Sequence, residues 1–264
     1  MCGHGFAQPL PTQDELDSFY SSGHYWHEPG GNAYQVAHEN HQAKIRLACV
    51  LNHLSHESIS SDHLLNVLDI GAGHGCIANW LQITQSISVG TYLFVEPDET
   101  NAGKILNQHA DFRMVRKEDT RLIESDSLDL IFMNHVLEHV AAPRAFLAEA
   151  VRTLRPGGIA YVETPHQDFR FKPDVFPHLH FFSAASVRAL VDSKTATLVN
   201  CETFGAWPGT PSGIPSLAHR LLDRMFRFCV DTQLHSAQHW MDDKIWRYDS
   251  NSDGIWIRWI LRKL

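Results

Sequence analysis

Apolar residues recur along this chain first as a helical stripe and then as short runs separated by further stripes. In residues 36–54, six positions spaced three or four apart are apolar except for Asn40, and Leu51 widens the stripe, which predicts an amphipathic helix. Short apolar runs then predict strands, with turn residues at their ends. The expected strands are 64–70, 89–96, 112–115, 128–134, 159–163, 198–204 and 255–262.

Helical patterns fill the segments between these runs. Residues 98–109 are expected to form one helix, and a second apolar face runs from Phe146 to Leu154, where Pro156 ends it. Ser183 is a suitable N-cap for a helix through residue 191. Strands separated by helices require right-handed crossovers, so the order predicts an α/β fold with a Rossmann-like, mostly parallel sheet and helices on both of its faces.

A segment between the sixth and seventh expected strands interrupts this alternation. It opens at residues 207–213 with a composition rich in Pro and Gly, which is typical of a loop. It continues around Leu217, Leu221 and Met225 with the spacing of an amphipathic helix. We therefore expect a helical insertion at residues 205–253.

Composition and charge narrow the classes of partner. The chain has 264 residues, with 22 basic and 30 acidic side chains and a net charge of -8, which disfavours a nucleic-acid partner. No run approaches the roughly 20 apolar residues of a membrane span, so we expect no membrane partner. Five scattered cysteines form no C-x-x-C pair, which is typical of reduced thiols. We expect a cytoplasmic protein.

The most informative motif follows the first expected strand, at residues 67–75. Asp69 precedes a turn in which three glycines alternate, so backbone N–H groups at a helix start can face a ligand without obstruction by a Cβ atom. The last glycine arrives one residue too early for a dinucleotide motif, and Asp69 is suited to an amine that a pyrophosphate lacks. The turn residues expected to touch this ligand are Gly71, Ala72, Gly73 and Gly75.

A second acidic residue ends the next expected strand. Glu96 lies directly before Pro97, at a position where a carboxylate can accept both hydroxyls of a ribose. Asp69 and Glu96 would thus hold opposite ends of a nucleoside with an amino-acid group. The alternative is an ordinary glycine turn with solvated acids at two strand ends.

Together these motifs resemble class I S-adenosylmethionine-dependent methyltransferases, most closely the small-molecule branch with ubiquinone-biosynthesis-like enzymes. Residues 128–140 and the run at 154–158 resemble two further motifs of the family, and the resemblance covers residues 64–191. It implies S-adenosylmethionine as cofactor, with Asp119 near the adenine and Asn134 and His135 near the methionine part. It also implies a seven-stranded sheet whose last strand is antiparallel and inserts beside strand five.

The resemblance also suggests how the chain is divided. Residues 1–58 would form an N-terminal lid and helix, and residues 59–204 the cofactor-binding core. The insertion at 205–253 would form a substrate lid over the carboxyl ends of the strands, and residues 254–264 would be the final strand of the sheet.

Methyl transfer to a hydroxyl also needs a base, which a nearby His or carboxylate can supply. His135 and His180 are the leading candidates because they lie at strand ends, although a single residue of this kind is more often structural or solvated than catalytic. Tyr25 and Tyr34 could contact the cofactor or acceptor, or instead pack on the insertion. The further candidates for contact with the acceptor are His139, His166, His178 and Trp207.

A metal site is a weaker hypothesis. Some quinone O-methyltransferases of the family carry E-x-x-E-H after strand four, where this chain has His135, Glu138 and His139. These are competent ligands, but the same triplet can simply start a helix under the sheet. We expect no metal.

Several readings of the function remain open. The favoured one is methyl transfer to a small molecule, with O-methylation ahead of N- or C-methylation. A non-catalytic module that binds S-adenosylmethionine, or a protein or nucleic-acid methyltransferase, is the alternative. The segment after Asn134 lacks the Pro-Pro-aromatic string of enzymes that methylate base amines. The sequence leaves monomer and homodimer undecided.

Overall fold

The structure is a computed structural model and describes residues 2–21, 33–54, 63–84, 87–109, 111–172, 175–207 and 213–264. Its helices are α1 (Gln13–Ser21), α2 (Ala33–Leu51), α3 (Cys76–Ile83), α4 (Glu99–Gln108), α5 (Pro143–Thr153), α6 (Ala184–Leu190), α7 (Ser216–Asp231) and α8 (His235–Trp246). Its strands are β1 (Gly5–Phe6), β2 (Leu64–Ile70), β3 (Ser88–Val95), β4 (Arg113–Met114), β5 (Leu128–Asn134), β6 (Leu154–Pro165), β7 (His180–Phe181), β8 (Ala196–Phe204) and β9 (Trp256–Lys263). Three short 3-10 helices are η1 (Lys117–Leu122), η2 (Leu137–His139) and η3 (Asp168–Arg170).

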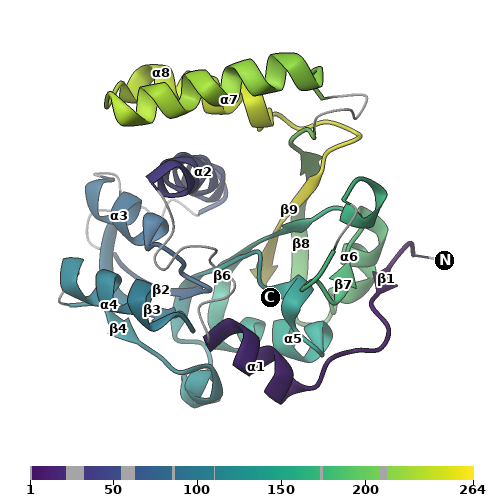
Figure 1. Cartoon of the computed structure of the whole chain (residues 1–264). Coiled ribbons are helices and arrows are strands. Elements are labelled where there is room, and N and C mark those ends of the chain that lie inside the picture. Colours follow the sequence, from purple (N-terminus) through teal and green to yellow (C-terminus); the bar gives the residue numbers. More distant parts are fainter. Residues whose placement is uncertain are drawn as a thin grey trace.

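Seven strands form one sheet in the order β4-β3-β2-β5-β6-β9-β8 (Figure 1). The pairs from β4 to β6 are parallel, as the helices between them require. β9 lies between β6 and β8 and is antiparallel to both. This confirms the expected α/β fold with a mostly parallel sheet and an antiparallel last strand beside the fifth strand of the core.

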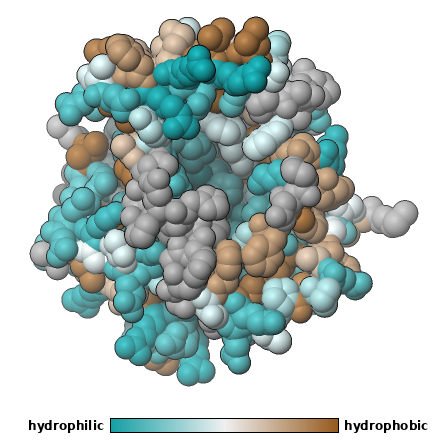
Figure 2. Space-filling view, viewed as in Figure 1, coloured by the Kyte–Doolittle hydropathy of each residue, from teal (hydrophilic) through white to brown (hydrophobic). Residues whose placement is uncertain are grey.

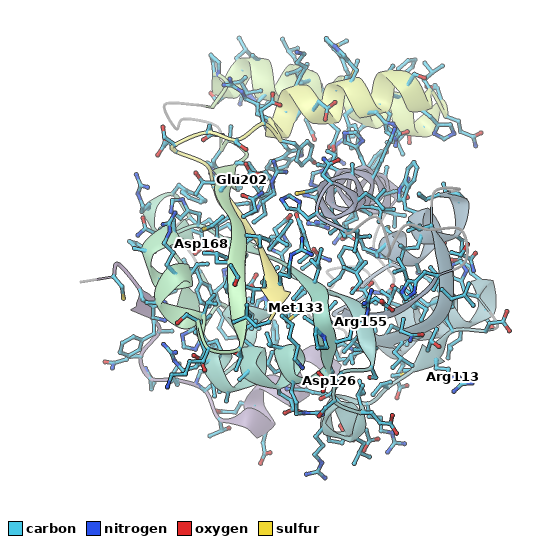
Figure 3. All side chains as sticks on the ribbon, turned by 180° about the vertical axis from the view of Figure 1, so that it is seen from behind. Arg113, Asp126, Met133, Arg155, Asp168 and Glu202 are labelled. Carbon is cyan, nitrogen blue, oxygen red and sulfur yellow. The ribbon has the colours of Figure 1, made fainter. Side chains whose placement is uncertain are left out.

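Helices cover both faces of the sheet, because the buried strands are apolar on both sides. On one face, α2, α3 and α4 pack over Val67, Phe94 and Phe132. On the other, α5 and α6 pack over Ile131 and Val162. In Figure 3, Arg155 and Asp126 mark the edge where β6 begins, and Asp168 lies toward the edge where it ends. The motif residues gather at that second, carboxyl edge.

The insertion contains two helices where the sequence pattern predicted one. α7 and α8 pack on each other and on α2, and form an outer layer beyond the carboxyl edge (Figure 1). The inward face of α8 consists of Gln238, Met241, Asp242 and Ile245. Two of these four side chains are polar, so the apolar stripe that normally identifies a helix is missing.

A second, two-stranded sheet was not expected either. β1 pairs antiparallel with β7, so residues near the N-terminus lie against the segment that follows β6. Each strand has only two residues, too few to give a detectable alternation of apolar and polar positions.

Candidate active site

The glycine turn between β2 and α3 has the backbone that its sequence requires. Gly71, Gly73 and Gly75 have φ angles of 74°, 54° and 72°, a region that other residues rarely adopt. A Cβ atom on Gly71 would lie 2.7 Å from Val136 Cγ2, and one on Gly75 2.8 Å from Ile105 Cγ1. Glycine is therefore needed at both positions for the conformation and for the space.

Glu96 follows β3 and faces this turn. Its carboxylate accepts hydrogen bonds from the N–H groups of Gly73 at 2.7 Å and Asp98 at 2.9 Å. Burial raises its pKa to about 7, although the two backbone donors act in the opposite direction. The neighbouring Pro97 is exposed at the rim. The structure thus brings Glu96, the residue predicted to bind the ribose, together with the glycine turn.

Asp69 lies deeper, at the end of β2. Its Oδ2 accepts a hydrogen bond from the Tyr92 hydroxyl at 2.6 Å, and its Oδ1 is buried without a partner in the described structure. Burial raises its pKa to about 6 despite Tyr92 and nearby Arg46. Across the turn, Asn134 Oδ1 is also buried without a hydrogen-bond donor. Two orphaned acceptors beside a turn that only glycine can form suit a ligand with a cationic amino group and N–H or O–H donors.

The other predicted cofactor contacts lie around the same edge. Ala72 is buried within the turn, and its N–H donates to the Val95 carbonyl at 3.1 Å. Asp119 lies half-buried in η1, which follows β4 at the edge of the sheet.

His135 begins the loop after β5 with a positive φ of 55°. Its Nδ1 lies 3.3 Å from Glu138 and its Nε2 3.3 Å from Glu163, the residue opposite Asn134 on β6. Burial opposes its protonation, but the two carboxylates outweigh burial and raise its pKa to about 9. His135 is thus protonated at neutral pH, which suits a charge partner better than a proton acceptor.

Glu163 joins His135 to α2. Arg46 binds both oxygens of Glu163, at 2.5 and 3.2 Å, and the Tyr161 hydroxyl donates to Glu163 at 2.7 Å. Although burial disfavours its charge, Arg46 and His135 hold the pKa of Glu163 well below its usual range. The sequence pattern had not singled out Arg46, but a cation on a helix face that also carries Ala43, Leu47 and Val50 was a readable signal.

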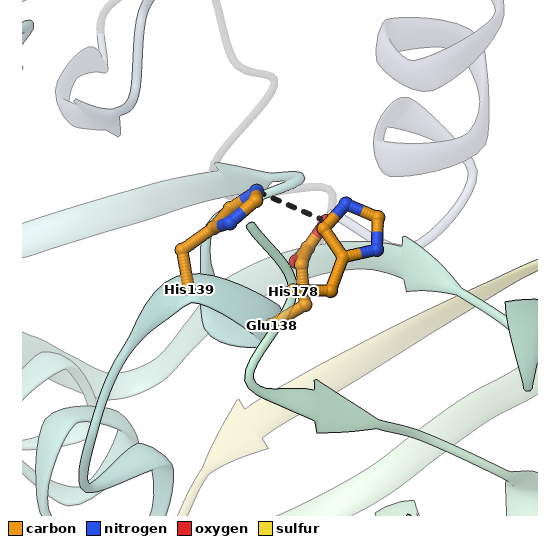
Figure 4. Close-up of side chains that lie close together, drawn as sticks. All are labelled: Glu138, His139 and His178. Carbon is orange, nitrogen blue, oxygen red and sulfur yellow. Dashed lines mark ion pairs between the residues drawn. The ribbon is translucent and has the colours of Figure 1, made fainter. Parts of the chain in front are cut away.

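A second cluster lies next to His135. Potential ligand atoms of Glu138, His139 and His178 all lie within 4.8 Å of one another (Figure 4). Burial lowers the pKa of His139 to about 4, so this ring is neutral, and His178 Nδ1 is 2.6 Å from the buried Asp168. This set differs from the predicted metal ligands, His135, Glu138 and His139. His178 stands in place of His135, which also contacts Glu163.

These three side chains are competent ligands for a divalent metal. The charges around them, however, are already balanced. Two cations, Arg46 and His135, offset two anions, Glu138 and Glu163, along a continuous line of contacts. A divalent ion would add two positive charges beside this line of contacts.

The remaining predicted residues contact other partners. His180 Nδ1 lies 3.1 Å from His4 Nε2, and the two rings stack. His166 Nδ1 bonds the Gly254 carbonyl, and Trp207 packs beside Trp246.

The two predicted tyrosines have different outcomes. Tyr34 donates to Asp231 at 2.9 Å and lies under Arg227, so it packs on the insertion, the second of the two arrangements considered for it. Tyr25 lies outside the described residues.

A contact between α2 and the glycine turn was also missed. Glu39 Oε2 lies 2.5 Å from Nδ1 of His74, the residue between Gly73 and Gly75. On the same helix, His38 and His41 contact Asp242 and Asp243 of α8, each at 2.7 Å. These pairs depend on long-range packing, which local periodicity does not encode.

The comparisons with known proteins agree with this geometry. A family model described as "Methyltransferase domain" matches residues 36–198, more than half of the chain. The chain therefore belongs to this methyltransferase family, and S-adenosylmethionine is its cofactor. The fold and the motif order place it among the class I enzymes.

Relatives with similar sequences are O-methyltransferases of ubiquinone biosynthesis. The chain is 31% identical over 173 residues to the one from Rhizobium rhizogenes and 28% identical over 174 residues to the one from Agrobacterium fabrum. Each match covers 60% of this chain and 65% of the relative. The chain thus spans slightly less than two thirds of the relatives that it matches.

Solved structures share the fold at low identity. A Thermotoga maritima protein described as a possible histamine N-methyltransferase superposes with a TM-score of 0.55 at 17% identity, covering 94% of this chain and 98% of the other. The [4+2]-cyclase SpnF gives 0.59 at 13% identity, covering 98% of both chains. These likenesses concern the fold alone.

Proposed function

We propose that this protein transfers the methyl group of S-adenosylmethionine to a small-molecule acceptor, with a hydroxyl oxygen as the favoured target. The observation that carries the proposal is the pairing of Glu96 with the glycine turn, beside the orphaned acceptor of Asp69. Glu96 would hold the ribose hydroxyls, and Asp69 and Asn134 would lie at the amino-acid end. The similarity to the ubiquinone O-methyltransferases supports a small acceptor and an oxygen target.

The cofactor supplies an electrophilic methyl group on a sulfonium, so the protein has to align the acceptor, exclude water and accept a proton. His178 is the better proton acceptor in this site. Its Nδ1 is held by buried Asp168 at 2.6 Å, which leaves Nε2 to face an acceptor hydroxyl. The protonated His135 would serve as a positive charge beside the acceptor, and His180 would pack on the N-terminal strand.

Calorimetry tests cofactor binding. Wild-type protein should bind S-adenosylmethionine and S-adenosylhomocysteine in the micromolar range, on the order of -7 to -9 kcal/mol, and should not bind NAD. Glu96→Ala should weaken both ligands strongly, whereas Glu99→Ala, an exposed change three residues along, should not. Binding of NAD by the wild type would contradict the proposal.

A screen of phenolic, amine and carboxylate acceptors with labelled cofactor tests the oxygen target and the base. His178→Gln should lower kcat by roughly 10²- to 10⁴-fold with little change in cofactor affinity. Asp168→Asn should lower kcat less and shift the pH profile of the activity.

A chelator tests whether the site works without a metal. Activity that resists chelators, in protein free of metal by elemental analysis, would support a site without metal. Loss of activity with a chelator and recovery with a divalent ion would overturn this expectation.

A further inference from the structure

Helix α7 carries apolar side chains on two neighbouring faces, whose centres lie roughly 110° apart around the helix axis. The inner face packs Leu222, Phe226 and Cys229 into a small core with α8. The outer face bears four large apolar side chains spaced four, four and three residues apart. Their exposed fractions are 64% for Leu217, 52% for Leu221, 49% for Met225 and 61% for Phe228. The helix needs only its inner face to pack, so the fold does not account for this outer stripe.

Positive charge borders the outer stripe. Arg220 and Arg224 are exposed beside it and form no ion pair with any residue of the described chain. The acids of α7 are already engaged, because Asp223 pairs with Arg227 at 3.0 Å and Asp231 accepts from Tyr34. The outer face therefore keeps two uncompensated positive charges in a protein whose net charge is -8.

The outer face of α7 is accessible to an extended flat surface. α7 and α8 form the outermost layer of the molecule, and hydrophobic residues show on that side in the space-filling view (Figures 1 and 2). The stripe from Leu217 to Phe228 extends about 16 Å along the helix. On α8, Trp240 is also 54% exposed, with the Lys244 ammonium 5.7 Å from its ring centre. An exposed Trp beside Lys is typical of a membrane interface.

We propose that α7 docks flat on an anionic phospholipid bilayer, with the outer stripe buried at the acyl boundary and Arg220 and Arg224 at the phosphates. An amphipathic helix with this pattern binds a membrane surface without crossing it. No helix in the described residues is long and apolar enough to span a bilayer, and this mode does not need one. A second copy fits less well when the two α7 helices pack antiparallel, because a twofold axis then places the arginines of both copies along the same edge of the interface.

Vesicle co-sedimentation of the full chain tests the proposal, with phosphatidylcholine vesicles that contain or lack phosphatidylglycerol. Wild-type protein should sediment with the anionic vesicles only. Arg220→Gln and Arg224→Gln should each weaken binding about fivefold. Leu221→Ser with Phe228→Ser should abolish it, whereas Leu122→Ser, a 71% exposed site in η1, should not change it. Unchanged melting temperatures would show that all variants fold.

Three results would overturn the proposal. The first is a wild type that stays in the supernatant with anionic vesicles. The second is equal binding to neutral vesicles that ignores the arginine changes. The third is a dimer in analytical ultracentrifugation that the Leu221→Ser and Phe228→Ser changes dissociate, which would assign the stripe to a second copy. Cofactor affinity, measured in parallel, keeps these outcomes separate from the proposed methyl transfer.

Discussion

Individual buried charges determine how the candidate site responds to pH. Arg46, Glu163, His135 and Glu138 neutralise one another, so each charge is stable only while its partner is present. Glu96 differs, because its carboxylate is buried with two backbone donors and no cation. Single substitutions at these two places should therefore change the pH dependence in the same direction but in different pH ranges, because both pKa values are raised on folding.

Glu96→Gln should change how the stability of the cofactor-free protein depends on pH. Its pKa rises from 4.5 to about 7 on folding, so the folded state binds the proton more tightly. Wild-type stability should then fall between those two values, by on the order of 3 kcal/mol. Urea unfolding at about pH 5 and about pH 8 should show the Gln variant gaining relative to wild type at the higher pH. A parallel pH dependence of the two proteins would contradict this account.

His135→Asn should also gain relative to wild type as pH rises, but over a higher pH range and starting from a variant that is less stable than wild type. The pKa of His135 rises from 6.5 to about 9, so its contribution is complete below 6.5 and lost as pH rises through 9. The Asn variant should be less stable by about 2 to 3 kcal/mol near neutral pH, with the difference shrinking above about pH 9. Asn tolerates the positive φ at this position, so backbone strain does not obscure the result. A constant difference across pH would indicate lost packing instead.

Among the elements, α2 and α8 share two adjacent His–Asp contacts that differ in burial. Asp242 is fully buried and also accepts from the Tyr248 hydroxyl at 2.8 Å, whereas the Asp243 side chain is 53% exposed. Asp242 and Asp243 thus provide a matched pair for measuring how much each His–Asp contact contributes to the attachment of α8 to α2.

Asp242→Ala should cost about 2 to 4 kcal/mol of unfolding free energy, because it leaves the Tyr248 hydroxyl and His38 without their acceptor. Asp243→Ala removes an exposed contact and should cost less than about 1 kcal/mol. Thermal or denaturant unfolding of both variants measures the difference. Equal losses would mean that burial of Asp242 does not govern the attachment of the insertion.

Periodicity predicted elements where one face is apolar and failed where polar residues are buried. Strands β2, β3, β5 and β6 were expected because their inward positions are largely apolar. Helix α2 was expected from the spacing of Ala43, Leu47 and Val50, although three polar residues of this helix are buried as well. α8 was missed because Gln238 and Asp242 face inward. Asp242 becomes compatible with burial only once α2 supplies a partner, His38, and sequence spacing does not contain that information.

At the scale of the whole molecule, the sheet order and the cofactor edge could be predicted, whereas the acceptor side could not. The glycine turn and Glu96 are constrained by backbone conformation and strand ends, which local sequence specifies. The cluster of Glu138, His139 and His178 joins η2 to the segment after β6, some forty residues later. Such contacts depend on how two loops fold over one edge, and no short motif encodes them.

Helix α2 touches the cofactor turn with Glu39 and the insertion with the preceding residue, His38. The His38 ring lies 5.1 Å from the ring of Trp246. Arrival of a nucleoside at the turn should therefore alter indole fluorescence at the far side of the helix. Titration with S-adenosylhomocysteine should change the emission of the wild type, and Trp246→Phe should remove most of that change while Trp240→Phe retains it. If cofactor binding also changes the affinity for an acceptor held by the insertion, reciprocity requires that the acceptor changes cofactor affinity by the same factor. The fluorescence of Trp246 would then report the coupling between the two ligands.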